Sequence, residues 1–151
     1  MQRQSYFFLF EKSMTAGKQN EVTIVILERI SGPADVKKLN EAELSLLCGE
    51  LRQFLVESVS RTGGHLASNL GAVELTVAIH RVFDTDRDRL VFDVGHQCYV
   101  HKALTGRRAL FGALRQFGGL GGFPKPGERV HAAVLARPAA HSVSPALGLA
   151  R

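Results

Sequence analysis

Tryptophan is absent from the 151 residues, and cysteine occurs only twice, at Cys48 and Cys98. No Cys-x-x-Cys pair and no histidine–cysteine cluster at metal-ligand spacing occurs, so the pattern favours neither a disulfide framework nor a zinc site. Cys48 lies on the apolar side of a predicted helix and is expected to be a small core residue. Cys98 follows His96 closely enough to suggest a nucleophile or ligand, although a lone loop thiol usually has no such role. Two reduced cysteines are typical of a cytoplasmic protein.

Long hydrophobic runs are also missing. No apolar stretch approaches the ~20 residues that span a bilayer, so we expect no membrane association. The apolar run 6–10 is too short for a secretory signal core, and no small-residue cleavage site follows it. Residues 1–26 show no helical periodicity and differ in composition from the rest. We therefore expect an atypical, disordered leader over 1–26 and one incomplete domain over 27–151.

The chain carries a net charge of +5, but its basic residues are scattered. The densest groups are only the pairs Lys37-Lys38 and Arg107-Arg108. Nucleic-acid-binding proteins usually concentrate such charge on one face. A solvated basic surface is the favoured interpretation, and we expect no nucleic-acid partner.

The clearest predicted helix begins after Asn40 and runs to about Ser60. Asn40 and Glu43 form a capping-box pattern, in which each side chain can bond the other residue's backbone amide. Apolar residues follow at steps of three and four positions, which is the period of an amphipathic helix: Leu44, Leu47, Cys48, Leu51, Phe54, Leu55 and Val59.

The remaining pattern alternates helices with one clear strand. A second helix is predicted from Asn69 or Gly71 to Phe83. It is apolar nearly all round and is therefore expected to be buried in an assembly or a domain interior. Arg89–Val94 is a short β-branched run typical of a strand. Short helices are predicted at 100–104 and 108–115, a Gly/Pro loop at 117–127 and a further helix at 142–150. Helices around a buried strand, without hairpin signals, favour an α/β architecture.

Two histidines follow glycines at predicted element ends. Gly63-Gly64 can bring the main chain close to a ligand while His65 moves protons near neutral pH; the alternative is a helix C-cap followed by a surface histidine, which spacing alone favours. His96 follows Gly95 at the carboxyl end of the predicted strand, where ligands gather in α/β sheets; an incidental turn histidine is equally compatible.

Two further segments have chemical interpretations. His101-Lys102 could present a second histidine and a cation to an anionic ligand, although such a pair more often begins a solvated helix. The glycine-rich segment 118–122 matches neither a P-loop nor a dinucleotide fingerprint. It is more typical of a flexible loop than of a lid.

Several motifs in order give the chain a specific resemblance. They are Leu27-Glu-Arg-Ile-Ser-Gly-Pro33, Gly64-His-Leu-Ala-Ser-Asn-Leu-Gly71, Val73-Glu-Leu-Thr76, Asp93-Val-Gly-His-Gln97, His101-Lys-Ala-Leu-Thr-Gly-Arg107, Arg115-Gln116, Gly118-Gly-Leu120 and Gly122-Phe-Pro124. Together they cover about two thirds of the chain, from residue 26 to 126. The chain resembles the start of 1-deoxy-D-xylulose-5-phosphate synthases, which belong to the transketolase-like superfamily.

This resemblance implies a transferase that depends on thiamine diphosphate and Mg²⁺, with part of a cofactor-binding domain in which helices surround a small parallel sheet. The implied reaction decarboxylates pyruvate and joins the product to D-glyceraldehyde 3-phosphate, which gives 1-deoxy-D-xylulose 5-phosphate for isoprenoid, thiamine and pyridoxal synthesis. By match, His65 would shuttle protons near the substrate and His96 would contact the cofactor. The full-length family is homodimeric.

The chain also departs from the family pattern. A Gly-His segment expected to contact the cofactor falls at Arg137-Pro138-Ala139-Ala140, and the Gly-Asp-Gly…Asn motif for metal and diphosphate is absent. No metal ligands are therefore assigned. We expect the chain to be a truncated, inactive fragment. The alternatives are half of a split synthase completed by a partner chain, or a non-catalytic basic binding protein.

Overall fold

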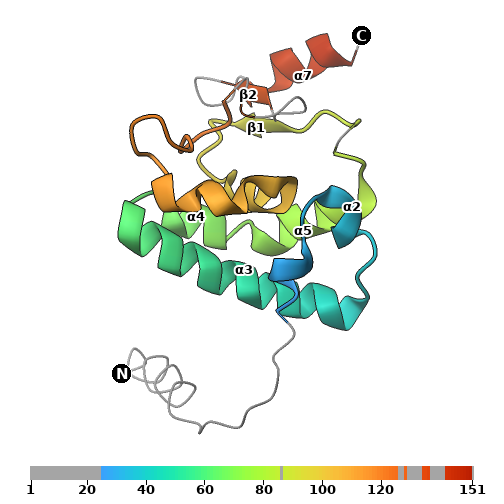
Figure 1. Ribbon diagram of the computed structural model, residues 1–151. Helices are drawn as coiled ribbons and strands as arrows, with labels where there is room; N and C mark the ends of the chain where they lie inside the picture. Colours follow the sequence, from blue (N-terminus) through green and yellow to red (C-terminus); the bar gives the residue numbers. More distant parts are fainter. Residues whose placement is uncertain (1–24, 86, 126–127, 129–133, 137–141, 151) are drawn as a thin grey trace, which may run out of the picture.

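The computed structural model describes residues 25–85, 87–125, 128, 134–136 and 142–150. Most of the expected leader and the Arg137–Ala140 segment lie outside the described residues. The long helix α3 (Glu41–Thr62) runs along one side of the molecule, and the strands β1 (Val91–Asp93) and β2 (Val134–Ala136) lie on the other (Figure 1). Shorter helical segments fill the space between them. None of the helices in the described part is long and apolar enough to cross a membrane.

The helix α3 begins and ends where the sequence predicts. Asn40 Oδ1 accepts a hydrogen bond from Glu43 N at 2.9 Å, and Glu43 Oε2 accepts one from Asn40 N at 3.0 Å, which confirms the capping box. Leu47, Leu51 and Leu55 are fully buried on one face. Fully burying a leucine contributes roughly 1.5–3 kcal/mol, so this stripe fixes which face of α3 meets the core.

The second predicted helix begins slightly later in the structure, at Val73. A short helix α4 (Leu66–Leu70) precedes α5 (Val73–Val82), and the chain turns between them at Gly71 and Ala72. Within the described chain this helix is not buried all round, because Leu75 is 65% and Val82 70% exposed. Its burial in an assembly stays a prediction. Only one face of α5 packs on its neighbours.

The strand β1 is shorter than the predicted Arg89–Val94. Val94 has φ 60°, and Gly95 has φ 86°, so the backbone leaves the extended conformation directly after Asp93. β1 pairs in parallel with β2, with Val91 opposite Val134. The described residues are mostly helical, and their β structure consists of these two strands of three residues each. One parallel pair of this length is not enough to show the small parallel sheet, surrounded by helices, that the family resemblance implies.

The rest of the chain follows the predicted order. Two short segments precede α3, namely η1 (Leu27–Arg29) and α2 (Pro33–Val36). After β1 come α6 (Tyr99–Lys102), a kinked turn η2 (Ala103–Arg107) and a 3-10 segment η3 (Arg108–Ala113), followed by the Gly/Pro loop. The helix α7 (Val143–Leu149) confirms the prediction for 142–150. Buried side chains from α2, α3, α5, α6 and η3 meet in a single core.

Candidate active site

His65 lies directly after the glycine pair that follows α3. Gly63 closes the helix with φ 73°, and its N–H donates to Val59 O at 2.8 Å. Gly64 has φ 150°, and a Cβ atom there would lie 2.9 Å from Tyr99 Oη. A side chain at Gly64 is therefore excluded by both conformation and space. The glycine pair does form a helix C-cap, but His65 is partly buried, and the residue that approaches the glycines is Tyr99.

The second candidate, His96, lies in the turn that follows β1. The positive φ angles of Val94 and Gly95 turn the chain out of the strand, and Gly95 N donates to Asp93 O at 2.6 Å. The ring centroids of His65 and His96 lie 5.4 Å apart with an interplanar angle of 67°. The structure thus brings together the two histidines that the sequence singles out.

The side chain of Asn69 holds the two histidine loops together. This residue of α4 is 0% exposed. Its Nδ2 donates to His65 O at 2.5 Å and to His96 O at 2.8 Å. Its Oδ1 accepts from Tyr99 N at 2.8 Å. One buried amide therefore fixes the backbone at both histidines and at the start of α6.

An aromatic side chain from the glycine-rich loop, Phe123, also lies beside His65. We call His65, His96, Asn69 and Phe123 the histidine cluster. The Phe123 ring centroid lies 5.5 Å from that of His65, in an edge-to-face arrangement. Two buried oxygens, Ser68 Oγ in α4 and Gln97 Oε1 directly after His96, have no hydrogen-bond partner among the described residues. Buried polar atoms are normally paired, so these two oxygens are candidate acceptors for a water or a bound ligand.

The pair His101-Lys102 does not face solvent or an open site. His101 is 2% exposed and Lys102 0% exposed. The distance between His101 Nδ1 and His80 Nε2 is 3.0 Å. Lys102 Nζ bonds to the carboxylate of Glu128 at 2.7 Å. Both sequence interpretations, an anion-binding pair and a solvated helix start, are therefore wrong.

The two cysteines have no reactive environment. Cys98 is fully buried, and burial raises the pKa of its thiol to about 11. Because the thiolate is the nucleophile, Cys98 is unsuited to that role despite its position near His96. Cys48 is half-buried beside the core, and burial raises its thiol pKa as well.

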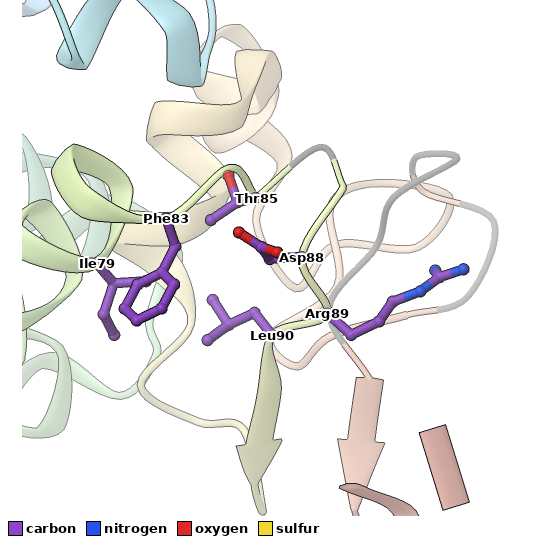
Figure 2. A pocket seen from close by; sticks show the side chains of 6 residues that line it. All are labelled: Ile79, Phe83, Thr85, Asp88, Arg89 and Leu90. Carbon is purple, nitrogen blue, oxygen red and sulfur yellow. The ribbon is translucent and has the colours of Figure 1, made fainter. Parts of the chain in front are cut away.

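Two cavities among the described residues lie away from the histidines. One has a volume of about 170 Å³ and lies where the end of α5 meets the residues before β1, at the opposite end of the strand from His96. Figure 2 shows Ile79 and Phe83 facing Leu90 across this apolar hollow, while Arg89 points away. The other, about 770 Å³, lies between η1, α3 and η3. Neither is lined by a residue of the histidine cluster.

A metal site is not formed by the part of the chain that the structure describes. Within those residues no group of three or more histidine, cysteine, aspartate or glutamate side chains is placed to hold an ion. Mg²⁺ prefers carboxylate oxygens and water, and the histidine cluster supplies neither a carboxylate pair nor a charge of the right sign.

Sequence reasoning assigned no role to the residues that surround the two histidines, namely Asn69, Tyr99 and Phe123, or to Glu128, the partner of Lys102. Asn69 and Tyr99 occur in short helices where asparagine and tyrosine have many ordinary roles. Phe123 and Glu128 belong to a segment that pattern alone describes only as a loop. The one available signal was the demand for glycine at Gly64, which indicates a close neighbour without identifying it.

Comparison with known proteins agrees with the motifs. Residues 27–151 match the family model described as 1-deoxy-D-xylulose-5-phosphate synthase. The chain is 57% identical over 129 residues to the synthase of Bordetella petrii, which covers 85% of this chain and 21% of the relative. It is 58% identical over 125 residues to the synthases of Leptothrix cholodnii and Acidovorax sp., which covers 83% of the chain and 20% of each relative. The chain thus spans about a fifth of the length of these relatives. On this evidence the chain belongs to the 1-deoxy-D-xylulose-5-phosphate synthase family.

Proposed function

We propose that the chain supplies part of the active site of a thiamine-diphosphate-dependent transferase that converts pyruvate and D-glyceraldehyde 3-phosphate into 1-deoxy-D-xylulose 5-phosphate and CO₂. The supporting observation is the approach of His65 and His96, whose ring centroids lie 5.4 Å apart although they belong to different elements. The family membership of residues 27–151 gives this pair its chemical interpretation.

In this proposal the two histidines have different tasks. The imidazole of His65 accepts and returns protons near the substrate, since histidine titrates near neutral pH. The imidazole of His96 contacts the cofactor. Thiamine diphosphate, when bound, supplies the electron sink for the carbon that loses CO₂. The protein's share is to hold the two rings in fixed positions, and Asn69 does so by bonding the carbonyls of both histidines.

The described residues fit an organic cofactor better than its metal. Ser68 Oγ, three positions after His65, and Gln97 Oε1, directly after His96, are buried oxygens without a partner among the described residues. No carboxylate cluster within the described part could hold Mg²⁺. The proposed Mg²⁺ would therefore need ligands outside the described residues. No catalytic step is assigned to the metal.

The wider setting is proposed on family resemblance alone. We infer that residues 27–151 are part of a larger α/β cofactor-binding domain with helices around a parallel sheet, to which β1 and β2 belong. The full-length protein would work in the cytoplasm as a homodimer. Half of a split synthase, completed by a partner chain, remains the alternative organisation.

A graft tests the proposed roles. Residues 27–128 replace the matching segment of the Bordetella petrii synthase, and CO₂ release from pyruvate is measured with thiamine diphosphate, Mg²⁺ and D-glyceraldehyde 3-phosphate present. We expect turnover, and His65→Ala should lower kcat by roughly 10²–10⁴-fold, the usual contribution of a positioned acid–base group. His96→Ala should raise the concentration of thiamine diphosphate needed for half-maximal rate.

The controls separate a lost role from a lost fold. Lys38→Ala, at an exposed position far along the chain from both histidines, should leave the graft unchanged. Full activity of the His65→Ala graft would contradict the proposed proton transfer. The isolated 151-residue chain should give no product under the same conditions, and measurable turnover by it would refute that expectation.

A further inference from the structure

The ammonium group of Lys102 is completely occupied by the protein itself. Its side chain is 1% exposed. Nζ donates to Gly121 O at 2.6 Å, to Phe123 O at 2.8 Å and to Glu128 Oε2 at 2.7 Å. A lysine ammonium has three donors, and each is used here. Lys102 therefore has no donor left for a substrate, and its charge acts on the loop that contains Gly121 and Phe123.

The carboxylate of Glu128 connects this loop to the helical segments a second time. Oε1 accepts from Gly121 N at 2.9 Å, while Oε2 accepts from Lys102 and from Arg107 Nη1, the latter at 3.2 Å. Arg107 Nη2 in turn donates to Thr105 Oγ1 at 2.7 Å. We name Lys102, Arg107 and Glu128 the loop-anchoring cluster. It joins residues 121, 123 and 128 to α6 and η2.

The same loop reaches the histidine site through Phe123. The carbonyl of Phe123 is held by Lys102, and its ring packs edge-to-face on His65 at a centroid distance of 5.5 Å. Backbone and side chain of one residue thus link a buried cation to the candidate catalytic imidazole. Charged hydrogen bonds are shorter and stronger than neutral ones, so the bond from Lys102 is a strong restraint on the backbone of Phe123.

We propose that Lys102 is a positioning residue for His65, and that it acts by fixing the 121–123 loop so that the Phe123 ring restricts the His65 imidazole. The catalytic meaning of this contact rests on the proposed function, but the contact itself does not. Arg107 and Glu128 hold Lys102 in place and balance its charge. The cluster sets the geometry of the site without touching substrate.

The test uses the intact 151-residue chain and nuclear magnetic resonance of its histidine side chains. Phe123→Leu removes the aromatic ring and defines how the His65 ring signals move when the contact is lost. Lys102→Met keeps the aliphatic stem and removes the charge. We expect it to move the His65 signals in the same direction as Phe123→Leu and to a similar extent. It should also speed hydrogen exchange of the Gly121 amide.

Two controls make the result specific. Lys125→Met removes an exposed lysine from the same loop and should leave the His65 signals in place. The amide signals of Leu47 and Leu51 in the α3 core should stay unchanged in all variants, which excludes general unfolding as the cause. Glu128→Gln, a milder change, should shift His65 in the same direction by less, and it replaces Lys102→Met if that variant does not fold.

The outcomes distinguish this proposal from the proposed function. His65 signals that stay in place in folded Lys102→Met, or in Glu128→Gln if Lys102→Met does not fold, would overturn the positioning role, whatever the enzyme assay shows. Shifted His65 signals, together with full activity of the His65→Ala graft, would leave the positioning intact and overturn the catalytic role of His65. In the graft, Lys102→Met should lower kcat more than it changes KM.

Discussion

Replacing Asn69 with alanine removes a side chain that bonds the backbone at both His65 and His96. Three hydrogen bonds are lost: two from Nδ2 to the carbonyls of His65 and His96, and one from Tyr99 N to Oδ1. A buried backbone group left without a partner costs about 1–3 kcal/mol. Tyr99 is 0% exposed, so water does not readily reach its amide. The two histidine residues are only partly buried, and water can replace Asn69 at their carbonyls.

We therefore expect Asn69→Ala to lower the free energy of unfolding by roughly 2–4 kcal/mol, most of it from the Tyr99 amide. With a urea dependence of about 2 kcal/mol/M for a chain of this size, the midpoint of urea unfolding should fall by roughly 1–2 M. Circular dichroism at increasing urea concentration measures this midpoint. The loss is a large part of the roughly 5–15 kcal/mol that stabilises a typical domain.

Asn40→Ala is the matched control, because Asn40 is an exposed asparagine that also bonds a backbone amide through its side chain. Loss of such an N-cap costs about 1 kcal/mol, so its midpoint should fall by roughly 0.5 M. If Asn69→Ala unfolds at the same urea concentration as Asn40→Ala, the buried amide does not hold the site together and the reasoning fails.

Three further changes have defined outcomes. Gly64→Ala should lower the free energy of unfolding by about 1–3 kcal/mol, because its backbone would be strained and its Cβ would press on Tyr99 Oη. Gly49→Ala, with nothing within 4 Å of its Cβ, should instead gain stability in the same thermal melt. Equal melting temperatures of the two variants would contradict this. Stability should fall as pH rises from about 9 to about 11, because burial raises the pKa of Cys98 from 9.0 to about 11 and the unfolded chain loses that proton first; Cys98→Ala should remove this part of the slope in urea titrations. Leu75→Lys, at a 65% exposed position, should raise solubility in precipitation assays without lowering the melting temperature, and a lower melting temperature would show that the α5 face is already packed.

Local sequence signals predicted most of the elements and both ends of α3. The capping box at Asn40 and Glu43 and the glycine at Gly63 determine both ends of α3, because each acts within one helical turn. The positions of His65 and His96 after glycines were also predicted from neighbouring residues. The sequence could therefore place both histidines at the ends of elements without knowledge of any contact to a distant residue.

The tertiary structure alone decided what surrounds those histidines. Asn69 bonds Tyr99 across 30 positions of sequence, and Lys102 bonds Glu128 across 26. Sequence patterning favoured a solvated Lys102, because charged side chains are rarely buried unless paired, and the pairing partner lies on a distant loop. The exposed apolar face of α5 likewise depends on which neighbours are present. Periodicity predicts that a side chain is apolar or charged, but burial and partnership are properties of segments far apart in the chain, and only their packing determines them.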